Sequence, residues 1–198
     1  LIRKIGLQFA LTKKRKFMSE QKNTEVATLG NGCFWCTEAV FQRLKGVINV
    51  ESGYSGGDTE NPTYKEICTG TTNHAECLNI TFDPAVISFE DLLEIFWNSH
   101  DPTTPNRQGN DVGTQYRSII FYHDEQQRET AEKYKKQLDE KGVFKNPIVT
   151  IIEPFTKFYK AEDYHQDYYN QNGSAPYCQF VVRPKVEKLV KNYSKKLK

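Results

Sequence analysis

Residues 26–44 read VATLGNGCFWCTEAVFQRL and predict a short strand that turns directly into a helix. Val26–Leu29 is largely apolar, as expected of a buried strand, and the glycines at positions 30 and 32 favour a turn after it. From Cys33 to about Leu44 the apolar residues recur at helical spacing, and a glycine at position 46 ends the pattern. This strand–helix unit indicates a fold that mixes strands with helices.

The rest of the chain continues the mixture of strands and helices. We expect strands at 47–54, 78–82, 118–122 and 148–152, and helices that begin near Ser88, Asp124 and Pro184. Up to the strand at 118–122, the order strand, helix, strand, strand, helix, strand is typical of the ferredoxin-like split βαβ arrangement. The predicted fold class is therefore α/β (α+β), a two-layer sandwich with a mixed sheet and an extended C-terminal segment. Two long polar loops, 55–76 and 100–116, are where chemistry is expected.

Positive charge is concentrated at the two ends of the chain. Residues 1–17 hold six basic side chains and no acid, and residues 183–198 hold seven basic side chains against Glu187. The segment between them, 18–182, holds 14 basic and 24 acidic residues. A basic face for nucleic acid is therefore not expected in the body of the protein.

The basic stretch 1–17 has three interpretations: an organelle-targeting peptide, a solvated tail, or a segment ahead of a natural start at Met18. We favour the last two, which make 1–22 a dispensable extension and 23–198 one domain. No apolar run reaches the roughly 18 to 20 residues of a membrane-spanning helix. We expect a soluble protein of the cytoplasm with no membrane partner.

The chain has five cysteines, at positions 33, 36, 68, 77 and 178. An odd number favours reduced thiols over a secreted disulfide scaffold, so Cys33-x-x-Cys36 indicates redox chemistry or a metal. Because a helix N-terminus lowers the pKa of a thiol, Cys33 is a candidate nucleophile. Two alternatives stay open: buried, inert thiols, or a zinc site that adds Cys68, His74 and Cys77, although these lack the paired short spacing of zinc ribbons.

Further motifs occur in one order along the chain. They are Gly32–Trp35 with Glu38, Gly53–Gly57, Asn61–Tyr64, His74–Glu76, Phe96–Trp97, His100–Thr103, Arg107–Asp111, Gly113–Ser118 and Ala161–Gln166. In this order they closely resemble the A-type peptide methionine sulfoxide reductases, from about residue 26 to 182. The resemblance implies that 23–198 is a catalytic domain. It would reduce methionine S-sulfoxide, protein-bound and free, and so repair oxidised proteins.

A sulfoxide sulfur is a poor electrophile until its oxygen is protonated or hydrogen-bonded. The reaction therefore needs a thiolate, an acid and an apolar slot for the methyl group. The resemblance implies a nucleophile at Cys33, an acid at Glu76, phenol donors at Tyr64 and Tyr116, pocket walls at Phe34 and Trp35, and substrate-positioning residues at Asp111 and His74. Burial would raise the pKa of the Glu76 carboxyl enough to keep its proton near neutrality. From the residues alone, Glu76 could also be a solvated loop carboxylate, and Asp111 and His74 could simply hold loops.

The resemblance also implies the redox cycle. Cys33 becomes a sulfenic acid, a second cysteine forms a disulfide with it, and an external dithiol such as thioredoxin reduces that disulfide. Either Cys36 or Cys178 could be the resolving cysteine; we favour participation of Cys178, in relay with Cys36, and leave Cys68 and Cys77 as structural. No bound metal, flavin or nicotinamide is implied, and a monomer is expected. The alternative functions are a general dithiol oxidoreductase and a zinc-stabilised binding module.

Overall fold

The computed structural model describes residues 23–198. Its centre is a six-stranded sheet with the order β7-β6-β1-β3-β2-β8, in which only the β6–β7 pair is parallel. The strands are β1 (Glu25–Asn31), β2 (Val47–Ser55), β3 (Ala75–Phe82), β6 (Ser118–Tyr122), β7 (Ile151–Pro154) and β8 (Phe158–Lys160). The four central strands, β6-β1-β3-β2, have the ferredoxin-like arrangement with the fourth expected strand beside the first. The predicted fold class is confirmed.

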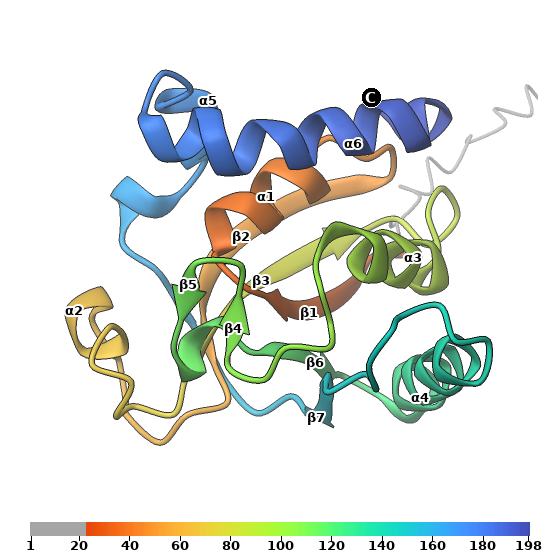
Figure 1. Ribbon diagram of the computed structural model, residues 1–198, viewed down its shortest axis with the longest axis horizontal. Helices are drawn as coiled ribbons and strands as arrows, with labels where there is room; N and C mark the ends of the chain where they lie inside the picture. The colour runs from red at the N-terminus through yellow and green to blue at the C-terminus, as the bar shows by residue number, and fades with distance from the viewer. Residues whose placement is uncertain (1–22) are drawn as a thin grey trace, which may run out of the picture.

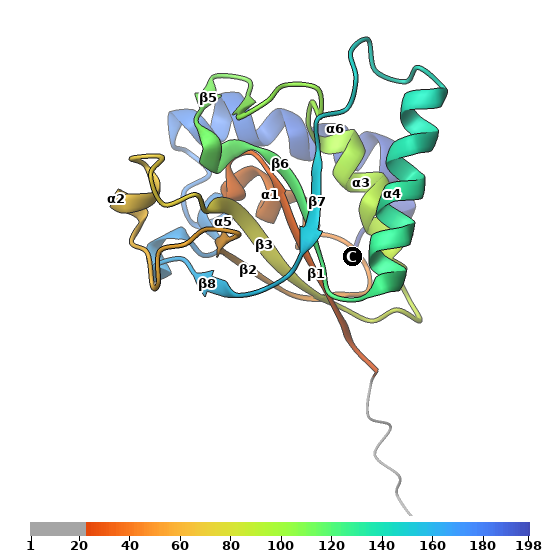
Figure 2. The same ribbon diagram turned by 90° about the horizontal axis from the view of Figure 1, so that it is seen from below.

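The longer helices form layers against this sheet. Helices α1 (Phe34–Phe41) and α3 (Phe89–Ser99) contact the central strands, and α6 (Arg183–Tyr193) crosses α1 as a further layer (Figure 1). Helix α4 (Glu125–Glu140) packs beside β6 and β7, and Figure 2 shows the sheet in front of α1 and α6. The main hydrophobic core lies between the sheet and these helices, where rings such as Phe41, Phe82 and Phe96 are completely buried.

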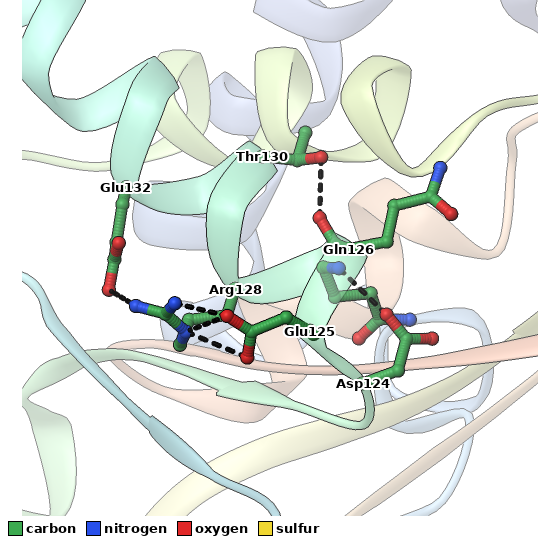
Figure 3. Close-up of polar contacts among 7 residues, drawn as sticks. Asp124, Glu125, Gln126, Arg128, Thr130 and Glu132 are labelled. Carbon is green, nitrogen blue, oxygen red and sulfur yellow. Dashed lines mark hydrogen bonds and ion pairs between the residues drawn. The ribbon is translucent and has the colours of Figure 1, made fainter.

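The helix starts follow the expected capping chemistry. The Asp124 carboxylate accepts a 2.8 Å hydrogen bond from the Gln127 N–H at the start of α4, and Ser88 and Asp91 form a capping box for α3. Within α4, Arg128 pairs with Glu125 and Glu132 on the exposed face (Figure 3). Exposed pairs of this kind support a helix only slightly, so α4 depends on its cap and on packing against β6 and β7.

Two strands at the sheet edges differ from the prediction. The strand expected at 148–152 begins only at Ile151, because backbone groups of residues 148–150 are hydrogen-bonded outside the sheet. The Ile148 N–H donates to Asp139, the Val149 N–H donates to Pro102, and the Thr150 carbonyl accepts from Lys135. Strand β8 was not expected; it pairs antiparallel with the end of β2.

Both long loops contain short helices or strands, and the first loop, predicted at 55–76, is shorter than expected. Strand β3 begins at Ala75 because β2 continues to Ser55 and pairs with it, so Glu76 lies on a strand and not in a loop. The first loop also contains α2 (Tyr64–Ile67), and the second contains the hairpin β4 (Arg107–Gln108) and β5 (Asp111–Val112) and a 3-10 turn at Thr114–Tyr116. Helix α2 and this hairpin lie at the same end of the sheet (Figure 1).

The C-terminal segment returns to this same end before it forms α6. It contains a 3-10 turn at Asp163–His165, the short α5 (Tyr168–Gln171) and a π-helical turn at Cys178–Val182 that runs into α6. The α6 start, with a proline in its first turn, agrees with the prediction. The predicted extension 1–22, including the targeting interpretation of 1–17, lies outside the described residues.

Candidate active site

The Gly32–Cys33 turn places a thiol at the start of α1. Gly32 has a φ of +101°, and a Cβ atom there would lie 2.7 Å from the Gln108 side chain, so only glycine fits this turn without displacing the β4–β5 hairpin. Cys33 is the N-cap residue of α1 but provides no side-chain cap. The free N–H groups of this helix end must therefore find another acceptor.

That acceptor is Glu76, which reaches α1 from the neighbouring strand β3. The Phe34 N–H, the first of the helix, donates a 3.0 Å hydrogen bond to Oε2 of Glu76. Glu76 is 1% exposed, and burial raises the pKa of its carboxyl to about 8, although the hydrogen bond from Phe34 opposes this shift. The carboxyl is therefore mostly protonated at pH 7 and can act as an acid beside Cys33, whereas a solvated loop carboxylate could not.

The two thiols of the Cys-x-x-Cys segment share a hydrogen bond. It lowers the pKa of Cys36 to about 7, while burial, this hydrogen bond and the charge of Glu76 raise the pKa of Cys33 well above its ordinary value. The expected lowering of the Cys33 pKa by the helix N-terminus is therefore wrong for this closed site, because Cys33 is only 7% exposed and desolvation is the largest effect. The shared hydrogen bond therefore favours ionisation of Cys36 over ionisation of Cys33.

Both predicted phenols lie close enough to Glu76 to sense its charge. Tyr64 opens α2, where its N–H donates to Oε1 of Glu162 at 2.8 Å, and Tyr116 ends the 3-10 turn. Burial and then the charge of Glu76 raise the pKa of each phenol above its usual value. Both hydroxyls therefore keep their protons and remain hydrogen-bond donors.

The aromatic walls predicted at Phe34 and Trp35 are extended by the C-terminal segment. Phe34 is 1% exposed, whereas Trp35 is only partly buried. Tyr168 of α5 stacks on the Trp35 indole with ring centroids 3.8 Å apart, and Tyr177 lies edge-on to it at 5.7 Å. This side of the site is an aromatic cluster from two distant parts of the chain.

Asp111 and His74 have contacts that their predicted role did not include. The Tyr177 hydroxyl donates to Oδ2 of Asp111 at 2.8 Å and lies 3.9 Å from the Cys36 sulfur, so Tyr177 links the hairpin to the thiol pair. His74 is 2% exposed, and its ring nitrogens contact the Gly57 N–H at 3.0 Å and the Thr59 carbonyl at 2.8 Å. Its ring nitrogens thus hold the first loop, in agreement with the alternative interpretation of His74.

The two candidate resolving cysteines lie in different positions. Cys36 follows Cys33 by three residues at the start of α1, close enough for the two thiols to shift each other's pKa. Cys178 is completely buried in the turn before α6, and its thiol pKa is raised by burial and by the charge of Cys36. Cys68 is exposed and Cys77 is buried.

Sequence reasoning gave no role to His165, Tyr168 or Tyr177, which all contact the site. His165 was part of a recognised motif and Tyr177 precedes a recognised cysteine, so their positions in the sequence were a usable signal. In contrast, no local pattern shows that Tyr168 would stack on Trp35, because more than a hundred residues separate them.

Two hydrogen-bonded thiols beside a buried proton donor define the class of the site as that of a thiol-dependent oxidoreductase. The family model for peptide methionine sulfoxide reductase matches residues 25–198. The chain is 59% identical over 176 residues to peptide methionine sulfoxide reductase MsrA of Sulfolobus acidocaldarius, covering 87% of this chain and 97% of that protein. It is 58% identical over 174 residues to MsrA of Saccharolobus solfataricus, with 88% and 97% coverage.

Solved structures agree with this assignment. Reduced Mxr1 of Saccharomyces cerevisiae matches with a TM-score of 0.73 at 37% identity, and the match covers 78% of this chain and 89% of the Mxr1 chain. Methionine sulfoxide reductase A of Corynebacterium diphtheriae has a TM-score of 0.70 at 39% identity, with 79% and 78% coverage. A third structure is Mxr1 in complex with Trx2, with a TM-score of 0.54 at 27% identity and 78% and 91% coverage.

The chain therefore belongs to the peptide methionine sulfoxide reductases of the MsrA type, oxidoreductases that reduce methionine sulfoxide with thiols. The predicted family and enzyme class are confirmed, and the two alternative functions are not supported.

Within residues 23–198, no three His, Cys, Asp or Glu side chains are grouped as metal ligands would be. In the same part of the chain, no helix has both the length and the apolar character needed to cross a membrane.

Proposed function

We propose that Cys33 is the nucleophile that takes the oxygen of methionine S-sulfoxide. The Cys33 sulfur attacks the sulfoxide sulfur while its proton passes to the Cys36 thiolate, which is hydrogen-bonded to it. Oxygen is then transferred to Cys33, methionine leaves, and Cys33 becomes a sulfenic acid. In this step, the sulfoxide is reduced and the Cys33 sulfur is oxidised by two electrons.

The observation that carries this proposal is the hydrogen bond from the Phe34 N–H to Glu76. It fixes a buried acid, with a pKa raised to about 8, at the helix end that holds the nucleophile. Because Oε2 accepts the N–H as a carbonyl oxygen does, we assign the proton of the neutral acid to Oε1. Glu76 can then donate this proton to the sulfoxide oxygen as Cys33 attacks, which makes the sulfur electrophilic.

The other site residues would bind and orient the substrate. The Tyr64 and Tyr116 hydroxyls, protonated because of their raised pKa values, donate hydrogen bonds to the sulfoxide oxygen. Phe34 and Trp35 form the walls that receive the S-methyl group. Asp111, now in contact with Tyr177, would engage the substrate backbone once that contact is exchanged.

The second half of the cycle would use both remaining thiols of the site. The Cys36 thiol displaces water from the Cys33 sulfenic acid and forms the Cys33–Cys36 disulfide, a step favoured by the contact between these two residues. Cys178 then attacks the Cys36 sulfur, which releases the Cys33 thiol and leaves a Cys36–Cys178 disulfide. A dithiol of the thioredoxin type reduces this bond, and the complex of Mxr1 with Trx2 supports such a partner.

Further properties follow as predictions of the same proposal. The substrates are methionine S-sulfoxide in proteins and as the free amino acid. The only external requirement is a dithiol reductant, with no bound cofactor. The enzyme works as a monomer in a reducing compartment, the cytoplasm, which keeps its thiols available.

The test is turnover of the two separated methionine sulfoxide epimers with dithiothreitol and no nicotinamide. We expect reduction of the S epimer only, and loss of this activity in Cys33→Ser. Cys77→Ser is the matched control, because Cys77 is a buried thiol with no role in the proposed cycle. Full activity of Cys33→Ser, or equal reduction of the R epimer, would overturn the proposal.

A further inference from the structure

His165 lies at the centre of the aromatic side of the site. It is 1% exposed, and its ring centroid lies 4.4 Å from that of Tyr64, 5.0 Å from Phe34 and 5.6 Å from Trp35. It therefore touches both proposed methyl-pocket walls and one proposed phenol donor. No step of the proposed cycle uses it.

One hydrogen bond fixes the protonation of this ring. The Trp35 indole Nε1–H donates to Nδ1 of His165 at 3.1 Å, so Nδ1 must be without a proton. The neutral imidazole then carries its proton on Nε2, and burial lowers the pKa of His165, which favours this neutral form. His165 is thus held as a hydrogen-bond acceptor toward Trp35.

The second ring nitrogen has no such role in the fold. Nε2 of His165 is buried and has no hydrogen-bond partner among the described residues. A buried donor without a partner costs free energy. A leucine or phenylalanine of similar volume would avoid this cost if packing were the only purpose of the position, so the acceptor at Nδ1 is what the histidine contributes.

That acceptor limits the movement of the Trp35 ring. Tyr168 already covers one face of the indole at 3.8 Å, with the rings 8° from parallel. Stacking permits the indole to slide and rotate in its own plane, whereas a hydrogen bond at Nε1 fixes one edge. The indole face that Tyr168 leaves uncovered and the edge opposite Nε1 then have one defined position beside Phe34.

We propose that His165 is a positioning residue of the reductase site: its Nδ1 atom holds the Trp35 indole in the orientation that receives the S-methyl group of the substrate. This inference rests on the proposed function of Trp35 as a pocket wall. It requires that His165 acts through the Trp35 N–H and not through packing alone.

The experiment compares His165→Asn, His165→Gln and His165→Leu, each in the natural background and with Trp35→Phe. The amide oxygen of asparagine can take the place of Nδ1, whereas the longer glutamine places its amide near Nε2. We expect His165→Leu and His165→Gln to lower kcat/KM about threefold to tenfold, the range of one neutral hydrogen bond, mainly through KM. His165→Asn should stay within about twofold of the natural protein, because it restores the acceptor.

The Trp35→Phe background removes the N–H donor and makes the test specific. There, His165→Leu should change kcat/KM by less than about twofold, because the interaction it breaks is already absent. Losses that multiply in the double variant, or an asparagine variant as impaired as the glutamine variant, would overturn the proposal. His123→Leu is the control, because His123 bonds to Thr28 on the far part of the sheet and should leave turnover unchanged.

Tryptophan fluorescence separates this inference from the proposed function. The emission of Trp35 is obtained by subtracting the emission spectrum of the Trp35→Phe counterpart from that of each protein. It should change in His165→Leu and His165→Gln but not in His165→Asn, even if the natural protein failed to reduce sulfoxides. An unchanged Trp35 emission in all three variants would refute the role of the hydrogen bond. If His165→Leu does not fold, as judged by circular dichroism, the comparison of asparagine with glutamine gives the same decision.

Discussion

The substitution Glu76→Gln should stabilise the protein increasingly as the pH rises. Burial raises the pKa of Glu76 from 4.5 to about 8. Between these pH values, the folded protein keeps a proton that the unfolded chain has released, so its stability falls as the pH rises. At about 1.4 kcal/mol per pH unit, the natural carboxyl costs about 3 kcal/mol at pH 7 and about 5 kcal/mol at pH 9, relative to pH 4.

Glutamine removes this cost because it has no charge, and its amide oxygen can still accept the hydrogen bond from the Phe34 N–H. The assay is urea unfolding of both proteins from pH 5 to pH 9, with the difference in the free energy of unfolding plotted against pH. We expect this difference to grow across the range and to level off above about pH 8. A difference that does not change with pH would show that Glu76 is not a buried acid with a raised pKa, and the proposed proton donor would be lost.

Three further outcomes follow from the same geometry. Tyr64→Phe and Tyr116→Phe should each lower kcat about tenfold to a hundredfold with the fold unchanged, because each removes one donor to the sulfoxide oxygen; single-turnover kinetics would measure this, and unchanged rates would exclude that role. The single-turnover rate should rise as the pH passes about 7, where Cys36 loses its proton, and fall above about 8, where Glu76 does; a rate–pH profile without the alkaline fall would contradict the assignment of Glu76. Cys178→Ser should still form the Cys33–Cys36 disulfide in one turnover but lose thioredoxin-driven cycling, whereas failure to form that disulfide, seen in peptide maps, would contradict the proposed order.

Much of the fold could be predicted because local patterns and tertiary structure agree. The alternation of strands and helices, the caps at Ser88 and Asp124 and the proline near the start of α6 all depend on neighbouring residues. The predicted strand bounds are wrong where residues distant in the sequence determine the backbone hydrogen bonds. Residues 148–150 lose their strand pairing to Asp139, Pro102 and Lys135, and β3 is longer than expected because β2 continues beside it.

The site divides in the same way. Cys33, Glu76, Tyr64 and Tyr116 could be named from their motifs, and the structure brings them together. The ionisation of the thiols could not be predicted, because the effect of the helix end on Cys33 is outweighed by burial and by the hydrogen bond to Cys36. Nor could the motifs show that His165, Tyr168 and Tyr177 all contact Trp35, since these residues lie 130 or more positions from it in the sequence.

The most direct measurement is a single turnover of the fully reduced protein with excess methionine S-sulfoxide and no added reductant. We predict an early burst of one methionine molecule per protein molecule, together with a disulfide that joins Cys33 to Cys36 in the first trapped species. A slower second methionine should follow, because Cys178 releases the Cys33 thiol for one more attack. Methionine formed without any oxidation of the thiol at position 33, or no methionine at all from an intact and reduced protein, would contradict it.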